Sequence, residues 1–133
     1  MKYLLDTDIC IYWLKGRQPV RNRLLAVEWS ELGICVITVA ELYYGAYKSE
    51  QVAKNLARAS QFIQNLPVLP LSDNAIRRFG ELKAYLERIG QRIEDFDLLI
   101  ASVALTEGKI LVTNNTRHYD RITGLQLENW TLP

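Results

Sequence analysis

Residues 3–14 read YLLDTDICIYWL, a short apolar run followed at once by an acid and then by a second, longer apolar stretch. The run Tyr3–Leu5 predicts a strand, and Thr7 or Asp8 can cap a helix that follows it. A strand that passes directly into a helix is the repeating unit of an α/β fold. This arrangement places Asp6 at the carboxyl end of the first strand.

The same alternation continues along the chain. Further strands are expected at 33–37, 67–71, 109–113 and 124–129, with a loop at 114–123. Helices are expected at 20–29, from Thr38 onward, at 50–65, from Ser72 or Asp73 to Gly90, and at 96–105. Short apolar strands that alternate with helices predict an α/β fold with a central parallel sheet of four to five strands, covered on both faces.

Four oxygen-bearing side chains follow these elements, namely Asp6, Glu41, Asp97 and Asn115. In a parallel sheet the carboxyl ends of the strands share one edge, and ligands bind in the crevice there. A cluster of acids repels itself unless a cation neutralises it, and oxygen ligands suit Mg²⁺ or Mn²⁺. We therefore expect all four to be catalytic residues, with Asp6, Glu41 and Asp97 as metal ligands for phosphodiester chemistry.

Each of the four also has an ordinary structural explanation. Asp6 suits a helix N-cap, and Glu41 is the fourth residue of the capping-box pattern that begins at Thr38. Asp97 begins an apolar helix, where the helix dipole favours a carboxylate. Asn115 lies in an Asn-Asn pair that is typical of turns. The sequence leaves these alternatives open.

Three neighbouring residues are candidates for orienting ligands or water, namely Asp8, Thr113 and Asp120. Asp120 is also an alternative to Asn115 as the fourth acidic position. His118 is the only histidine, so a zinc site built from several histidines and a Ser-His-Asp triad are both hard to assemble. The sequence contains neither a GxxxxGK nor a GxGxxG phosphate loop.

Composition sets broad limits on the protein. With 133 residues, 49% hydrophobic and 23% charged, the chain fits one soluble domain spanning 1–133. The net charge of +1 provides no strongly basic surface for nucleic acid. Cys10 and Cys35 lack a C-x-x-C spacing and predict buried free thiols. Without a signal peptide or an apolar run long enough to cross a bilayer, we expect a cytoplasmic protein that does not bind membranes.

Four stretches together resemble the PIN-domain family and, within it, the VapC-type toxins of bacterial toxin–antitoxin pairs. These stretches are LLDTDICIYWL, ITVAELYYGAYKS, RIEDFDLLIASVAL and LVTNNTRHYDRITGLQLENW, in this order along essentially the whole chain. The resemblance implies a three-layer α/β/α domain and an Mg²⁺- or Mn²⁺-dependent ribonuclease. Its acidic site corresponds to Asp6, Glu41 and Asp97, while Asn115 stands where the family usually has aspartate.

The resemblance also implies partners. The LVTNNTR and ENW segments are similar to the VapC subgroup that acts on initiator tRNA. Such toxins form homodimers and are silenced by a VapB-type antitoxin whose C-terminal segment covers the crevice. Tyr12, Arg117 and Tyr119 are candidates for stacking on, or pairing with, single-stranded RNA.

Other functional classes remain open alternatives. Asp6-Thr7-Asp8 matches the D-x-D start of haloacid dehalogenase-like phosphatases, although the chain is short for that fold. A receiver-type signalling domain is also doubly wound, but it would need a lysine late in the chain, and none follows Lys109. Because Asn115 replaces an acid, an inactive RNA-binding PIN domain is a further alternative, as is a housekeeping PIN nuclease.

Overall fold

A single parallel sheet forms the centre of the molecule, which we describe for residues 1–133 from a computed structural model. Its five strands are β1 Tyr3–Leu5, β2 Leu32–Cys35, β3 Val68–Leu69, β4 Ile110–Val112 and β5 Leu127–Glu128. Their spatial order is β3-β2-β1-β4-β5, and every neighbouring pair is parallel. The chain builds outward from β1 on one side and then crosses to β4 on the other. The carboxyl ends of β1 and β4 therefore flank the switch point at which such sheets bind ligands.

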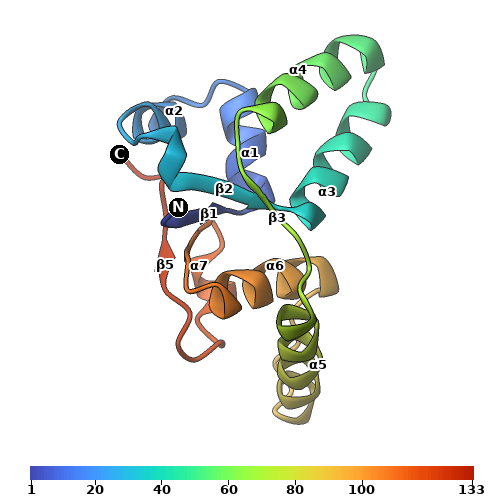
Figure 1. Cartoon of the computed structure of the whole chain (residues 1–133), viewed down its shortest axis with the longest axis vertical. Helices are drawn as coiled ribbons and strands as arrows, with labels where there is room; N and C mark the ends of the chain where they lie inside the picture. The colour runs from blue at the N-terminus through green and yellow to red at the C-terminus, as the bar shows by residue number, and fades with distance from the viewer.

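Helices cover both faces of this sheet (Figure 1). They are α1 Thr7–Leu14, α2 Gln18–Leu25, α3 Val36–Tyr47, α4 Val52–Gln64, α5 Asp73–Arg88, α6 Asp95–Thr106 and α7 Thr116–Tyr119, with a 3-10 turn η1 at Trp29–Glu31. Core residues of α1, α2, α3 and α4 pack together on one face, and core residues of α5, α6 and α7 pack on the other. The predicted three-layer α/β/α fold is confirmed.

The two cores follow from strand geometry. Successive side chains of a strand point to opposite faces of the sheet. Leu4 accordingly packs with α5 and α6, while Leu5 packs with α1 and α2. The helix α6 is buried on most sides, which explains its nearly continuous apolar sequence. Cys10 and Cys35 are both free and buried, as predicted.

Several predicted boundaries need correction. The strand predicted at 33–37 ends at Cys35, and α3 begins at Val36. Val36 and Ile37 are β-branched residues that favour strands, but the backbone N–H of Ile37 donates to the Cys35 Sγ, which caps the helix. The loop predicted at 114–123 contains the single-turn helix α7.

The N-cap of the first helix is Asp6, as the structural explanation of this residue predicted, and not Thr7 or Asp8. The Asp6 carboxylate accepts the backbone N–H of Thr7. The helix ends at Leu14, and Gly16 follows with a positive φ of 74°, a conformation that favours glycine. None of the helices is both long and apolar enough to cross a membrane.

Candidate active site

Asp6 occupies the switch point between β1 and β4. It is only 5% exposed, and its Oδ1 accepts the Thr7 backbone N–H at 2.9 Å. Its Oδ2 accepts the hydroxyl of Thr113 at 2.8 Å and that of Tyr119 at 3.3 Å. Thr113 directly follows β4, so one hydrogen bond joins the ends of the two strands. Asp6 is therefore both the cap of α1 and a buried acid at the predicted crevice.

Glu41 approaches Asp6 from α3. Its Oε1 accepts the Thr7 hydroxyl at 2.7 Å. The Thr7 Oγ1 also lies 3.0 Å from the Thr38 Oγ1. Because Thr7 has one hydroxyl proton and donates it to Glu41, Thr38 is the donor in this second bond. The capping-box alternative for Glu41 is wrong, since α3 already begins at Val36 and is capped by Cys35.

Asp8 and Asp97 complete the acidic group from the first turns of α1 and α6. One Asp8 oxygen, Oδ2, accepts the Asn114 backbone N–H at 3.1 Å. The other, Oδ1, is buried and has no hydrogen-bond partner. The Asp97 Oδ2 lies 3.9 Å from the Nε2 of His118. Four carboxylates from three helices and one strand end thus face one region.

Burial and mutual repulsion raise the pKa values of three of these acids. Burial, followed by the charge of Asp8, raises the pKa of Asp6 to about 7. Burial, followed by the charges of Asp6, Glu94 and Glu41, raises the pKa of Asp97 to about 6. The pKa of Asp8 is raised by its burial, and the charge of Asp97 adds to this effect. These shifts mean that the cluster resists carrying its full negative charge.

No lysine or arginine of the chain forms an ion pair with Asp6, Asp8, Glu41 or Asp97. Buried charges are normally paired or coordinate a metal. The carboxylates do not yet converge on one point: no group of three acidic, histidine or cysteine side chains is arranged to hold a metal ion by itself. Mg²⁺ usually binds through one or two carboxylates and keeps several waters, so this donor set fits a partly hydrated ion.

The helix α7 lies against the four carboxylates, and the position of its Tyr119 shows that one prediction was wrong. Tyr119 is fully buried, so it cannot stack on RNA, and its hydroxyl instead donates to Asp6. Burial, together with the charge of Asp6, raises the pKa of Tyr119, so this hydroxyl keeps its proton. Burial and the nearby Arg121 lower the pKa of His118, which leaves its imidazole uncharged at neutral pH.

The remaining predicted residues lie at different distances from the acids. Thr113 contacts Asp6 directly and also accepts the Asn115 backbone N–H at 3.0 Å. The Asn115 side chain is exposed and forms no hydrogen bond to the carboxylates. Asp120 is exposed, and its carboxylate forms no hydrogen bond or ion pair. The structure therefore brings Thr113, but neither alternative for the fourth acid, into contact with the cluster.

Thr7 and Thr38 are members of the site that sequence reasoning missed. They are buried at 9% and 0% exposure, and their hydroxyls connect α1 to Glu41 on α3. The position of Thr7 between Asp6 and Asp8 could have indicated a role in the site. The pattern around Thr38 indicated a helix cap and so pointed away from such a role.

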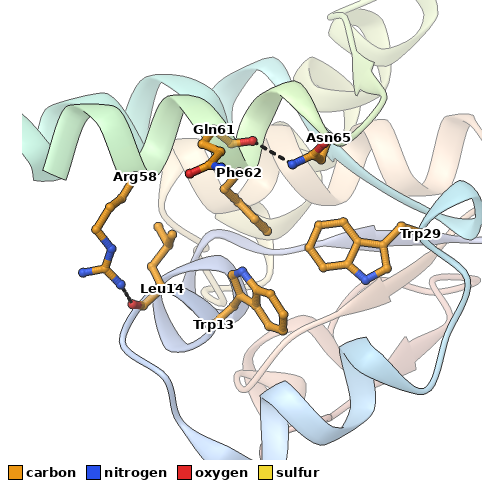
Figure 2. A pocket seen from close by; sticks show the side chains of 7 residues that line it. All are labelled: Trp13, Leu14, Trp29, Arg58, Gln61, Phe62 and Asn65. Carbon is orange, nitrogen blue, oxygen red and sulfur yellow. Dashed lines mark hydrogen bonds between the residues drawn. The ribbon is translucent and has the colours of Figure 1, made fainter. Parts of the chain in front are cut away.

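A groove leads away from Glu41 between α1, α3 and α4. A pocket of about 510 Å³ is lined there by Glu41, Leu42, Lys15 and Arg58, among others. It shares Leu14 and Arg58 with a second pocket of about 260 Å³ that Trp13, Trp29 and Phe62 surround (Figure 2). The Arg58 guanidinium donates to the Leu14 backbone carbonyl at the border between the two pockets. Figure 2 shows the three aromatic rings facing this second pocket together.

Comparison with known proteins identifies the family. Residues 3–125 match the PIN domain. The chain belongs to the PIN-domain family. It is 40% identical to ribonuclease VapC2 of Haemophilus influenzae over 130 residues, which are 98% of each chain. It is 36% identical to the tRNA(fMet)-specific endonuclease VapC of Shigella flexneri, over 98% of this chain and 99% of that one.

Solved structures agree with this assignment. The chain superimposes on DNA-bound VapBC from Salmonella typhimurium with a TM-score of 0.92 and 37% identity, over 98% of each chain. For VapBC2 of Rickettsia felis bound to a promoter fragment, the TM-score is 0.89 at 37% identity, over 98% and 99% of the two chains. The expectation of a VapC-type nuclease is confirmed. The haloacid dehalogenase-like phosphatase and the receiver-type signalling domain, which were the alternatives, are therefore wrong.

The Thr113→Val variant should raise the pKa of Asp6 further. Valine has nearly the same shape, but it removes the donor to Asp6 and the acceptor for the Asn115 N–H. Leaving buried polar groups unpaired should lower the free energy of unfolding by about 1–3 kcal/mol. A ¹³C NMR titration of the aspartate carboxyl groups and urea unfolding measure the two effects. The exposed Thr123→Val is the control, and an unchanged Asp6 pKa in Thr113→Val would contradict the expected role of this hydrogen bond.

Proposed function

We propose that this PIN domain is the toxin of a VapBC-type toxin–antitoxin pair and that it acts in the cytoplasm as a metal-dependent endoribonuclease. Its substrate would be a tRNA, with initiator tRNA as the specific candidate. The observation that carries the proposal is the group of four uncompensated carboxylates at the switch point, two of which have pKa values raised to about 7 and about 6.

Asp6, Glu41 and Asp97 would hold Mg²⁺ or Mn²⁺. When bound, the ion would lower the pKa of a water molecule and neutralise charge on the scissile phosphate. Hydrogen bonds within the chain orient the ligand carboxylates even without the ion. The hydroxyls of Thr113 and Tyr119 hold the Asp6 carboxylate in one orientation, and the Thr7 hydroxyl does the same for Glu41. Such hydrogen-bonded support fixes the direction of ligand oxygens.

One comparison supports tRNA as the substrate class, and one feature of the structure supports RNA in general. The Shigella flexneri relative is named a tRNA(fMet)-specific endonuclease and shares 36% identity over nearly its whole length. The chain also presents basic and aromatic groups beside Asp8. The Tyr12 hydroxyl accepts a bond from Asn114, and the Arg17 guanidinium lies 4.5 Å from the Tyr12 ring centroid. Stacked aromatic and guanidinium groups suit unpaired RNA bases.

A VapB-type antitoxin is the proposed protein partner, because the Salmonella typhimurium and Rickettsia felis structures are VapBC complexes. The groove from Glu41 to the aromatic pocket would accept an extended or helical segment of that partner. An arginine from the segment would suit the site, since its planar fork pairs with carboxylate oxygens and no arginine of this chain pairs with these four carboxylates.

Cleavage of a small set of RNA sites is the expected result with purified protein. The protein is incubated with total bacterial RNA and Mg²⁺ or Mn²⁺, and the new 5′ ends are mapped by sequencing. We expect the ends to concentrate in tRNA and to disappear when the cation is chelated. Cleavage that persists in chelator would refute the metal requirement. A folded, metal-binding protein that leaves RNA intact would instead be an inactive RNA-binding PIN domain.

Expression of the chain alone should arrest bacterial growth, and coexpression of its antitoxin should restore growth. The physical reason is that a partner segment seated over Asp6 and Glu41 excludes RNA from the carboxylates. Colony counts with and without the partner measure the effect, with Asp6→Asn as the inactive control. Unimpaired growth at a verified level of folded protein would favour a housekeeping nuclease.

A further inference from the structure

His118 is placed beside the acidic group but has no role in the site described above. The single turn α7 presents two consecutive side chains to two different carboxylates. The Tyr119 hydroxyl lies 3.3 Å from the Asp6 Oδ2, and the His118 Nε2 lies 3.9 Å from the Asp97 Oδ2. The two rings meet edge to face, with centroids 5.6 Å apart, so the buried Tyr119 supports the His118 ring.

The His118 Nε2 is a buried nitrogen with no hydrogen-bond partner, although a quarter of the side chain is exposed. Buried polar atoms are normally satisfied, and those that are not often mark an ion or a functional role. The 3.9 Å gap to Asp97 is too long for a hydrogen bond. Two ligands of one octahedral ion with bonds of roughly 2.1 Å lie about 3.0 Å apart when adjacent and about 4.2 Å apart when opposite, so the separation of the two side chains falls within the span of one shared ion.

We propose that His118 is a nitrogen ligand of the metal site and that it shifts the preference of the site from Mg²⁺ toward Mn²⁺. This inference rests on the metal-dependent function proposed above. Mg²⁺ is a hard cation that favours oxygen, whereas imidazole nitrogen suits first-row transition metals. Asp6, Glu41 and Asp97 offer only oxygen. His118 is the one side chain at the cluster that makes the donor set mixed.

The single histidine allows a direct spectroscopic test. The protein is produced with ¹⁵N-labelled histidine and with unlabelled histidine, and each sample is loaded with Mn²⁺ alone. Pulsed electron paramagnetic resonance detects nitrogen bound to Mn²⁺, and the signal should change between the two isotopes. Because the chain has only one histidine, any isotope-dependent signal comes from His118. This measurement needs neither RNA nor a variant that has to fold.

Metal affinities provide the second measurement. In His118→Ala, the Kd for Mn²⁺ measured by calorimetry should rise about tenfold or more, while the Kd for Mg²⁺ should change much less. The neighbouring Arg117→Ala is the matched control, since it shortens an exposed side chain of the same helix turn and should leave the Mn²⁺ preference intact.

The outcomes separate this inference from the proposed function. Wild-type protein that binds no Mn²⁺ would overturn both. Mn²⁺ that binds, is lost in Asp6→Asn and shows no nitrogen coupling would overturn only the role of His118. The same holds if His118→Ala weakens RNA binding at unchanged Mn²⁺ affinity, because the imidazole would then contact phosphate. Nitrogen coupling together with a selective loss of Mn²⁺ affinity would support the proposal.

Discussion

RNA cleavage by the Asp6→Asn variant should fall at least about a hundredfold, since loss of a group that only supports a metal ligand already costs roughly 10–100-fold and Asp6 is proposed as a ligand itself. Asparagine keeps an oxygen that can accept the Thr7 N–H, so the cap of α1 should survive. It removes a charge that is buried at 5% exposure and repels Asp8 and Asp97. We therefore expect the metal-free variant to be more stable than the wild type at neutral pH. Initial rates on tRNA and thermal unfolding measure the two effects.

The matched control for this variant is Glu107→Gln, which neutralises an exposed acid at the end of α6 with no ion pair. It should leave both the cleavage rate and the melting temperature nearly unchanged. If Asp6→Asn cleaves RNA at the wild-type rate, Asp6 does not belong to the active site. If the variant loses activity because it unfolds, the Asp6 hydrogen bond that caps α1 stabilises the fold by more than the buried charge of Asp6 destabilises it.

The metal-free protein should lose stability as the pH rises from about 4 to about 7, in the opposite sense to an ion-paired acid. The pKa of Asp6 is about 7 in the folded chain against 3.8 without burial. Below the lower value Asp6 is protonated in both states, so it adds no pH dependence. Between the two values the unfolded chain ionises more readily, so folding becomes less favourable by up to roughly 1.4 kcal/mol per pH unit. Above the higher value the loss levels off.

The whole loss from Asp6 is on the order of 4 kcal/mol, and Asp97 acts in the same direction because its pKa is also raised. His118 acts in the opposite direction at mildly acidic pH, since its pKa is lowered in the folded chain. Urea unfolding of the wild type and of Asp6→Asn across this range isolates the Asp6 contribution as their difference. Saturating Mn²⁺ should restore stability above neutral pH. Stability profiles of the wild type and of Asp6→Asn that run parallel across this range would refute the raised pKa of Asp6.

Boundaries were the weakest part of the sequence prediction, and Glu41 shows why. The strand predicted at 33–37 extends two residues too far because Val36 and Ile37 have high strand propensity. That shift made Thr38 look like a helix cap and Glu41 its capping-box partner. The actual cap, the Sγ of Cys35, is not a preferred capping group, so local sequence rules do not find it.

Local sequence patterns also could not predict the roles of side chains in residues 115–120. Tyr119 looked like a residue for stacking on RNA, yet it is buried and donates to Asp6 across 113 positions of sequence. Asn115 was the predicted fourth member of the site and Asp120 the alternative, and both prove to be exposed without contacts to the cluster. Their relation to a metal or to RNA stays a prediction.

The sequence by itself determined the alternation of strands and helices, the parallel sheet and the placement of Asp6 at a strand end. These features depend on local periodicity and on the shared edge of parallel strands, which residue patterns encode directly. Only the tertiary structure decided that Thr7 holds Glu41, that Tyr119 holds Asp6 and that His118 lies beside Asp97. Such contacts join elements far apart in the chain. They depend on strand order and helix packing, which no local pattern of residues specifies.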